Sequence, residues 1–406
     1  MGNLLDKKQL KEIIKEYNLK EGKDVVGAVK DLMKDILQEM LDEELEIDLG
    51  YSKYDYKNKK TDNSRNGHSK KKVRSTLGEV EIEVPRDRKG EFEPIAVKKH
   101  EKDISNIQDL IISMYGKGMT TRDISEHLAD IYGLSVSSDT VTRITDKLIP
   151  LIKDWQNRPL EELYVILYLD AMFFNVKQDG MIIKKSAYVI MGYTVEGFKE
   201  ILGIWIGENE SAKFWLNILN EVKNRGVKDI LIACIDGLSG FENALKTVFP
   251  NTEVQRCIVH QIRNSTKFVT YTDRKEFCRD MKDIYKASTE EAALMALEGF
   301  SKKWEKKYPY AIRSWENNWD SLATFFKYPA AIRRLIYTTN PIESFNNAVK
   351  KVAKTKRSFP TDEALLKILY LSSTDLSKKW CQKMRTWSSI INQLIIYFGE
   401  RVTNYI

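Results

Sequence analysis

Hydrophobic residues recur three or four positions apart through the first fifty residues of the chain, with charged residues between them. This spacing is typical of an amphipathic helix, and we predict one helix over residues 4–45. Its hydrophobic face comprises Val25, Val26, Val29, Leu32, Met33, Ile36, Leu37, Met40 and Leu41. A face this wide either packs within its own domain or associates with a second copy of the chain.

A basic segment follows at residues 51–76, where lysines and arginines outnumber acidic residues. Such a run is either a solvated loop or an arm that contacts phosphates. The phosphate contacts of an arm would be Lys70, Lys71, Lys72 and Arg74. Residues 80–84 then alternate Val or Ile with Glu, which predicts a short half-exposed strand ended by Pro85.

Residues 119–148 have the pattern of two short helices joined by a turn. Thr120 or Thr121 would cap the first helix and Ser137 or Ser138 the second, with Gly133 in a left-handed turn between them. This is the layout of a helix-turn-helix, whose second helix enters the DNA major groove, although two short helices also serve as plain scaffold. The outward residues of the second helix are Ser138, Asp139, Thr140, Thr142, Arg143 and Lys147.

Two later hydrophobic runs each end in an aspartate. Residues 165–169 stop at Asp170, and residues 229–235 stop at Asp236, where Gly237 allows a sharp turn. We interpret both runs as buried strands, each of which delivers a carboxylate at its end.

The segment between these two strands predicts how they are arranged. Residues 187–191 and 201–206 indicate an antiparallel meander with the first strand, and residues 211–224 an amphipathic crossover helix. A strand, a crossover helix and a further strand in one sheet run parallel. Both aspartate-bearing strands would therefore end at the same sheet edge, which makes Asp170 and Asp236 neighbours.

A helix at 239–248 and a strand at 253–258 complete a five-stranded core in the order β-β-β-α-β-α-β, the ribonuclease-H-like arrangement. The aromatic-rich segment 265–335 predicts an all-helical insertion. The next helix would start at Asn340 and carry Glu343, with a buried stripe of Ile342, Phe345, Val349 and Val352. Residues 380–398 predict a final helix.

The predicted fold is therefore a multidomain α+β protein. A ribonuclease-H-like α/β catalytic core is interrupted by an all-helical insertion and preceded by a helical and helix-turn-helix DNA-binding region. The expected domains are 1–50, helical and suited to dimerisation; 51–100, the basic arm and short β segment; 101–155, the helix-turn-helix; 156–264, the first part of the core; 265–335, the insertion; 336–375, the second part of the core; and 376–406, the C-terminal helix.

Asp170, Asp236 and Glu343 are the ligands that a site for two divalent metal ions would need. Two Mg²⁺ ions about 4 Å apart stabilise both the attacking and the leaving oxygen of a phosphodiester, and Mg²⁺, or Mn²⁺ as a substitute, prefers oxygen ligands. Each acid also has a structural interpretation. Asp170 would be a strand-end turn residue, Asp236 part of an Asp-Gly turn, and Glu343 the partner of Asn340 in a capping box.

Composition sets broader limits. Lys and Arg number 65 against 58 Asp and Glu, a formal net charge of +7 that suits a polyanionic partner. The four cysteines form no paired framework, and no hydrophobic run approaches the roughly 18 residues that span a bilayer. Without a secretory signal at its start, the chain is expected to be a cytoplasmic protein with reduced thiols and no membrane contact.

Three stretches carry a resemblance to a known family: Asp170-Ala171, the segment 233–264, and Tyr337-Thr338-Thr339-Asn340-Pro341-Ile342-Glu343-Ser344. Nearly end to end, the chain resembles the bacterial Mutator-type insertion-sequence transposases, which are related to the eukaryotic Mutator-like and hAT elements. The resemblance implies a DDE triad on Asp170, Asp236 and Glu343. It also implies dependence on Mg²⁺, recognition of terminal inverted repeats, and association with the nucleoid of a bacterium.

Cys257 and His260 have the spacing of half a zinc site, but no second pair follows nearby, so we do not expect zinc. The resemblance marks the pair as a motif that follows the second aspartate. His260 would then touch the scissile phosphate or order Asp236; the alternative is a satisfied histidine at a helix start.

Further DNA contacts are expected at Arg263, Lys350 and Lys351. Trp315 and Trp319 lie one helical turn apart, and the resemblance to hAT-like proteins implies that they stack an unpaired base. Residues at this spacing are also common core residues.

These observations together predict an Mg²⁺-dependent DNA transposase that is at least a dimer. It would bind terminal inverted repeats and target DNA, hydrolyse a strand and transfer the freed 3′-hydroxyl. Two alternatives remain open: a structure-specific nuclease that does not join strands, and a DNA-binding regulator with a catalytically idle core.

Overall fold

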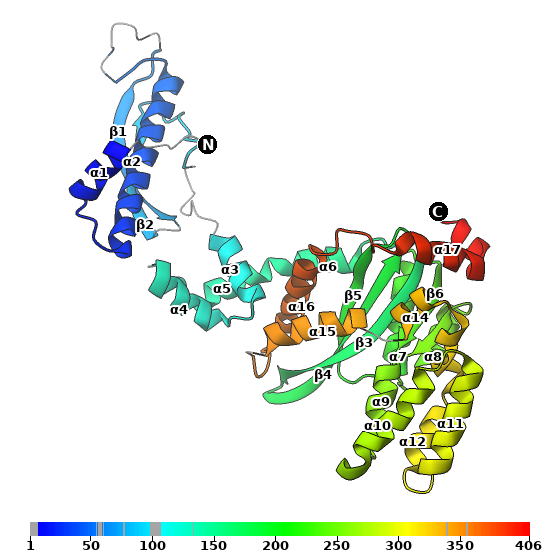
Figure 1. Cartoon of the computed structure of the whole chain (residues 1–406). Helices are drawn as coiled ribbons and strands as arrows, with labels where there is room; N and C mark the ends of the chain where they lie inside the picture. The colour runs from blue at the N-terminus through cyan, green and yellow to red at the C-terminus, as the bar shows by residue number, and fades with distance from the viewer. Residues whose placement is uncertain are drawn as a thin grey trace. The chain divides into compact units, whose positions relative to one another are not determined.

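The computed structural model describes residues 7–53, 55, 59, 61–75, 78–97, 107–132, 134–337, 340–354 and 356–406. The chain divides into two compact units, Met1–Asp146 and Lys147–Ile406, and each has its own set of packed elements (Figure 1). Together they make a multidomain α+β protein whose larger sheet is mixed. None of the described helices is long and apolar enough to cross a membrane.

Two helices open the first unit, α1 (Lys7–Glu16) and α2 (Gly22–Leu49), where the sequence predicted one. The single-helix prediction was wrong because a new helix start is stabilised inside the predicted range. The carboxylate of Asp24 accepts hydrogen bonds from the backbone N–H groups of Lys20 and Glu21, at 2.8 and 2.9 Å. This capping box satisfies donors that a continuous helix would bond internally. The helix ends at Gly50, whose φ of 70° is left-handed.

The basic segment pairs as β1 (Arg65–Ser75) with β2 (Gly78–Asp87), so the loop interpretation was wrong for these residues. Basic side chains of β1 lie across from acidic ones of β2, as in the 3.4 Å ion pair of Lys70 with Glu81. The hairpin also buries a hydrophobic face against α2. That core contains Leu41, Val73, Val80, Ile82 and Val97. Pro85 does not end β2, which continues to Asp87.

The helix-turn-helix elements appear as predicted. α3 (Ile107–Gly116), α4 (Thr121–Tyr132) and α5 (Ser138–Asp146) pack on one another. Thr120 and Asp123 cap α4 reciprocally, at 3.0 and 3.1 Å, and the Ser137 hydroxyl accepts from the N–H of Thr140 at the start of α5. The predicted turn residue Gly133 lies outside the described residues.

The second unit begins with α6 (Leu148–Asn157) and contains one mixed sheet in the order β5-β4-β3-β6-β7. Its strands are β3 (Leu163–Gln178), β4 (Met181–Thr194), β5 (Lys199–Gly207), β6 (Asp229–Ile235) and β7 (Glu253–Arg256). Strands β3, β4 and β5 form the predicted antiparallel meander, and β3, β6 and β7 are parallel. The predicted order of strands and helices is confirmed.

Helices cover both faces of this sheet (Figure 1). α7 (Ala212–Asn224), capped by Ser211, and α8 (Phe241–Val248) pack on one face through residues such as Leu167, Trp215 and Phe241. On the other side lie α15 (Asn340–Ala353), which contacts β3, and α16 (Asp362–Ser377), which contacts β5.

Strand β3 does not stop at Asp170, as the sequence predicted, but runs on to Gln178. The reason is its second neighbour. β6 stops pairing with β3 at Tyr168, opposite Cys234, while β4 keeps pairing with β3 as far as Gln178. Asp170 therefore lies in mid-strand, next to the place where the parallel neighbour has ended.

The chain after the sheet is helical, as predicted for residues 265–335. These helices are α9 (Ile258–Thr266), α10 (Tyr271–Tyr285), α11 (Glu290–Trp304), α12 (Pro309–Glu316), α13 (Trp319–Leu322), η1 (Thr324–Lys327) and α14 (Ala330–Ile336). The tail forms α17 (Trp387–Phe398) and α18 (Glu400–Thr403). The predicted tail helix thus starts at Trp387 rather than at Trp380. The indole N–H of Trp387 donates to the carbonyl of Val195 at 2.7 Å.

The packing between β3 and β4 leads to a test of stability. A Cβ added at Gly192 would lie 2.6 Å from Cδ2 of Leu167 and 2.8 Å from Cδ1 of Tyr164. We expect Gly192→Ala to lower the free energy of unfolding by about 1–3 kcal/mol, measured by urea denaturation, because the core is already filled.

The matched control is Gly299→Ala in α11, where an added Cβ meets nothing within 4 Å. It should leave stability unchanged or raise it by roughly 0.5–1 kcal/mol, since alanine restricts the unfolded chain more than glycine. Equal effects of the two substitutions would contradict the packing described for β3 and β4.

Candidate active site

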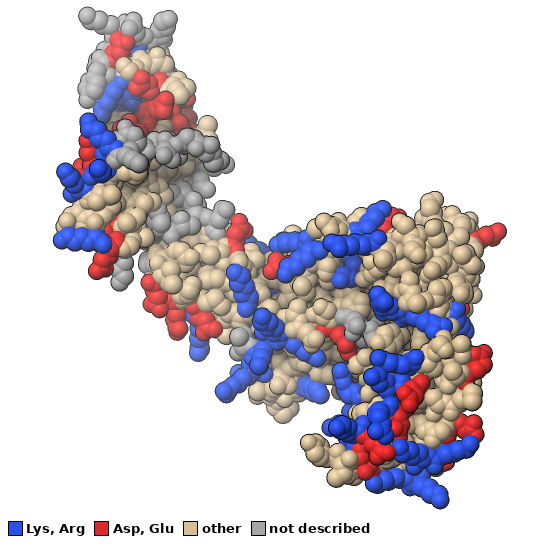
Figure 2. All heavy atoms as spheres, in the orientation of Figure 1, with Lys and Arg blue, Asp and Glu red and all other residues tan. Residues whose placement is uncertain are grey.

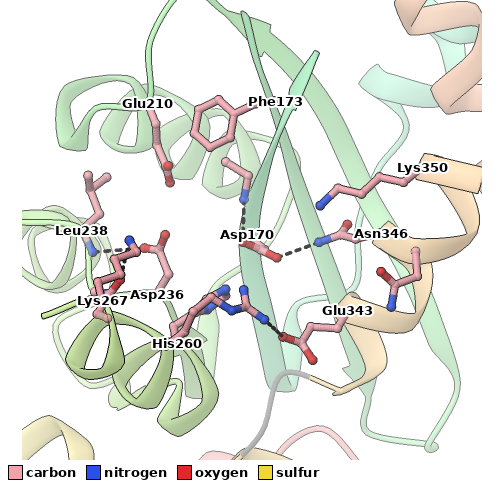
Figure 3. Close-up of a pocket in the computed structure, with 15 residues that line it drawn as sticks. Asp170, Phe173, Glu210, Asp236, Leu238, His260, Lys267, Glu343, Asn346 and Lys350 are labelled. Carbon is pink, nitrogen blue, oxygen red and sulfur yellow. Dashed lines mark hydrogen bonds and ion pairs between the residues drawn. The ribbon is translucent and has the colours of Figure 1, made fainter. Parts of the chain in front are cut away.

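The three predicted acids line one cavity of about 520 Å³ in the Lys147–Ile406 unit, although they lie far apart in the sequence. Asp170 comes from β3, Asp236 from the residue after β6, and Glu343 from the first turn of α15. Figure 3 shows their side chains around the same space, together with Glu210 and His260. The site is therefore built where β6 ends and β3 continues.

Asp170 is the most enclosed of the three, with 8% of its surface exposed. Its Oδ1 accepts from the N–H of Ala171 at 2.9 Å, and its Oδ2 accepts from Nδ2 of Asn346 at 2.6 Å. Burial raises the pKa of Asp170 to about 6; the neighbouring His260 opposes this shift, and the charge of Asp236 adds to it. The protein thus holds a carboxylate where its charge is unfavourable without a cation nearby.

Asp236 is held by the turn that it starts. Its Oδ1 accepts from the N–H of Leu238 at 3.1 Å, which fixes the carboxylate beside the backbone. The carbonyl of Ile235, one residue earlier, accepts from the N–H of Cys257 at 2.8 Å, so the strand end is tied to the start of α9. The predicted Asp-Gly turn and the predicted place in the site are both present.

Glu343 reaches the cavity because the sheet anchors the chain that enters α15. The hydroxyl of Tyr168 donates to the carbonyl of Leu335 at 3.0 Å, and Sγ of Cys234 to that of Ile336 at 3.5 Å. Both donors lie two residues before an active-site aspartate. Oε1 of Glu343 lies 3.8 Å from a guanidinium nitrogen of Arg263. The side chain of Asn340 lies outside the described residues, so the capping-box interpretation of Glu343 stays a prediction.

His260 lies in the first turn of α9 and lines the cavity. The adjacent Cys257 side chain, together with the charges of Asp170 and Asp236, raises the pKa of His260 to about 9, against the effect of burial. At neutral pH the imidazole is therefore protonated and positive. Cys257 is buried and does not line the cavity, so it acts on the site only through His260.

Basic side chains surround the acids. Arg263 of α9, Lys267 just after that helix and Lys350 of α15 line the cavity, and Lys351, the residue after Lys350, is exposed. Figure 2 shows Lys and Arg side chains spread over this face of the unit. Such a rim attracts a polyanion toward carboxylates that would otherwise repel it.

Apart from Lys147, which begins the second unit, and the two tryptophans, the other predicted DNA contacts belong to the first unit. Lys70 and Lys72 are exposed on β1, Lys71 is half-buried, and the side chain of Arg74 lies outside the described residues. On α5, Thr142 and Arg143 are exposed and Ser138 and Thr140 are partly so; Lys147 immediately follows and is also exposed. A guanidinium nitrogen of Arg143 donates to the hydroxyl of Thr140 at 3.0 Å.

The two tryptophans do not line the cavity. Trp315 is 1% exposed, and its indole N–H donates to Oγ of Ser265 at 3.0 Å. Its ring is therefore packed in the core, and the prediction that it stacks on a base was wrong. Trp319 is half-buried, and its N–H donates to Glu290 at 3.2 Å. The two residues lie on separate helices, α12 and α13, and not one turn apart on a single helix as their spacing suggested.

Several cavity residues were missed by the sequence analysis, Lys267 among them. Asn346 lies one turn after Glu343 on the same face of α15, and this spacing was the available signal. Glu210 precedes the Ser211 cap of α7. No sequence pattern marked it as a site residue, because it lies in a turn between predicted elements. Phe173 of β3 also lines the cavity and was hidden by the predicted end of that strand.

Comparison with known proteins adds an independent finding. The family model described as "Transposase, Mutator family" matches residues 5–383. The transposase for insertion sequence element ISRM3 of Rhizobium meliloti is 43% identical over 343 residues, covering 84% of this chain and 86% of that protein. The transposase for insertion sequence element IS1201 of Lactobacillus helveticus is 34% identical over 343 residues, covering 84% and 90%.

Among solved structures, the chain is similar to a Drosophila P element transposase strand transfer complex. The match covers 72% of this chain and 85% of that one, at 12% sequence identity and a TM-score of 0.29. A likeness at this level supports no argument about the site.

The hydrogen bond between Asn346 and Asp170 yields a test of the geometry. We expect Asn346→Ala to lower the free energy of unfolding by about 1–3 kcal/mol in urea denaturation, because a buried carboxylate loses its donor. The neighbouring Asn347→Ala, at an exposed cavity position, should change stability little. If both variants unfold at the same urea concentration, the bond to Asp170 does not contribute as described.

Proposed function

The chain belongs to the Mutator family of transposases, and from this premise we propose that it is a DDE enzyme acting on the ends of an insertion sequence. It binds the terminal inverted repeats, cleaves a strand beside them and joins the freed 3′-hydroxyl to target DNA. The observation that carries the proposal is the convergence of Asp170, Asp236 and Glu343 on one cavity.

The sheet supports a ribonuclease-H-like core. Three antiparallel strands followed by two parallel ones, in the order β5-β4-β3-β6-β7, match that arrangement. In this proposal the helices of residues 265–335 are an insertion between the last strand and α15. The core then consists of residues 156–264 and 336–375.

The donor set fits Mg²⁺, or Mn²⁺ in its place. Carboxylate oxygens are the preferred ligands of these ions, and Mg²⁺ is usually held by one or two carboxylates together with water and substrate phosphates. Among the described residues no three acidic, histidine or cysteine side chains are arranged to hold a metal ion on their own. When bound, two such ions would stabilise charge on the attacking and leaving oxygens. Asp170, Asp236 and Glu343 would hold them.

The remaining cavity residues position the acids and the DNA. Nδ2 of Asn346 orients the carboxylate of Asp170. The protonated imidazole of His260 places a positive charge beside the aspartates, where a phosphate would approach. Arg263, Lys267 and Lys350 neutralise neighbouring phosphates of the strand.

In the first unit, α4 and α5 are proposed to read the repeat and β1 to contact its backbone. The outward face of α2 is proposed to pair two copies of the chain, as an enzyme that joins two DNA ends requires. Val25, Val29, Leu32 and Ile36 are 42–52% exposed and repeat every three or four residues, the spacing of a coiled-coil seam. The opposite face of α2 is already buried on the hairpin, through Leu41.

The test of the triad is strand nicking on a labelled terminal repeat with Mg²⁺. Asp170→Ala, Asp236→Ala and Glu343→Ala should each lose more than the roughly 10–100-fold that removal of a group supporting a metal ligand costs. Glu208→Ala, exposed and outside the cavity, is the control. Normal cleavage by any one of the three variants would refute its role, and cleavage without a joined product would favour a nuclease that only hydrolyses.

The test of pairing is the mass of the full chain by light scattering. Leu32→Glu together with Ile36→Glu should convert the oligomer to a monomer, because charges would enter the hydrophobic seam. Lys34→Glu changes charge on the same helix outside the seam and should leave the mass unchanged. An unaltered mass for the double variant would exclude α2 as the interface.

A further inference from the structure

Glu210 is a fourth carboxylate on the wall of the active-site cavity. It lies in the turn between β5 and α7, immediately before the Ser211 cap, and is not one of the three acids of the triad. Figure 3 shows its side chain reaching toward the space shared by Asp170 and Asp236. Its position therefore raises the question of what a further negative charge does there.

The backbone on both sides of Glu210 is fixed by a single tyrosine. The hydroxyl of Tyr188 donates to the carbonyl of Asn209 at 2.6 Å and accepts from the N–H of Ser211 at 3.2 Å. Tyr188 is fully buried in β4, and its ring packs against those of Phe214 and Trp215. Glu210 is thus held between two hydrogen bonds to a core residue, and its direction into the cavity is set by the fold.

The surroundings of Glu210 disfavour its charge. Burial first, and then the charge of Asp236, raise the pKa of Glu210 to about 7, with a smaller contribution from Asp170. Its Oε1 is buried and accepts no hydrogen bond of regular geometry; the nearby indole N–H of Trp215 favours the charged form, but less than burial and Asp236 oppose it. An acceptor in this situation costs free energy unless a cation or a donor is supplied from outside the chain.

A second cavity oxygen is in the same situation. Asn346 is only 5% exposed, and its Nδ2 donates to Oδ2 of Asp170, which leaves its Oδ1 buried without a partner. A carboxylate can only accept, so this orientation of the amide is the one that Asp170 requires. The cavity therefore has unpaired oxygens on the Asp236 side and on the Asp170 side, and oxygen donors are what Mg²⁺ and Mn²⁺ bind.

We propose that Glu210 is a fourth acidic ligand of the divalent-cation site, binding on the side of Asp236. This inference rests on the proposed function and adds to the triad a residue that no triad pattern assigns. A helix-capping role does not account for it, because Ser211 already accepts the hydrogen bond from the N–H of Phe214 at 3.2 Å. A surface role does not either, since its oxygen is buried.

The test is the affinity of the full-length protein for Mn²⁺, measured without DNA by counting free Mn²⁺ with electron paramagnetic resonance. Glu210→Gln keeps the size of the side chain and removes the charge. It should weaken Mn²⁺ binding by about 10-fold or more, as loss of a ligand or its close support does. Glu208→Gln, two residues earlier and exposed, should bind Mn²⁺ like the wild type.

Thermal unfolding without metal separates a ligand from a structural residue. Glu210→Gln should then be as stable as the wild type or more stable, because one of the mutually repelling acids is gone. A variant that is destabilised, with unchanged Mn²⁺ affinity, would overturn the proposal.

Asp236→Asn separates a failure of the fourth ligand from a failure of the proposed cation site. If Asp236→Asn weakens Mn²⁺ binding and Glu210→Gln does not, the fourth ligand is refuted while the proposed triad stands. If neither substitution changes Mn²⁺ binding, the cation site of the proposed function is itself refuted.

Discussion

The repulsion between carboxylates that share one partly buried cavity is the constraint on which the site depends. Asp170 and Glu210 both have raised pKa values, and burial is the larger cause for each, followed by neighbouring charges. The chain offsets part of this cost with its own groups. Asn346 and the N–H of Leu238 donate to the aspartates, and Arg263 lies beside Glu343. The negative charge that these groups leave uncompensated would favour the cations of the proposed function.

Sheet geometry creates the place where these acids meet. β3 and β4 continue past the end of β6, so a carboxylate in mid-strand lies beside one that follows a strand end. Strands β3 and β6 also position the third acid, because Tyr168 of β3 and Cys234 of β6 donate to the carbonyls of Leu335 and Ile336 before α15. Side chains alternate between the faces of a strand, so Leu167 and Leu169 bury the core while Tyr168 and Asp170 serve the site.

The sequence predicted most of this framework because its signals were local. Hydrophobic runs, a crossover helix and the rule for parallel strands together placed Asp170 beside Asp236. What failed depended on distant partners. The predicted strand ended at Asp170 because the hydrophobic run stops there, whereas the length of β3 is set by its pairing with β4. β1 was not predicted as a strand, and its segment was interpreted as a solvated loop or a phosphate-contacting arm, because its charges hid the pairing with acidic β2. Glu210 was missed because Tyr188, far away in sequence, determines its place.

The arrangement of charge explains why a mildly basic chain has an acidic centre. DNA is a polyanion, so carboxylates alone would repel it. His260 carries a proton at neutral pH, and Arg263, Lys267 and Lys350 stand around the same cavity. These cations would attract phosphates to the rim, while the acids would hold the metal ions. In the proposed mechanism neither set of charges can work alone. The phosphate approaches the site only because the basic rim attracts it, and the acids repel the phosphate unless a metal ion lies between them.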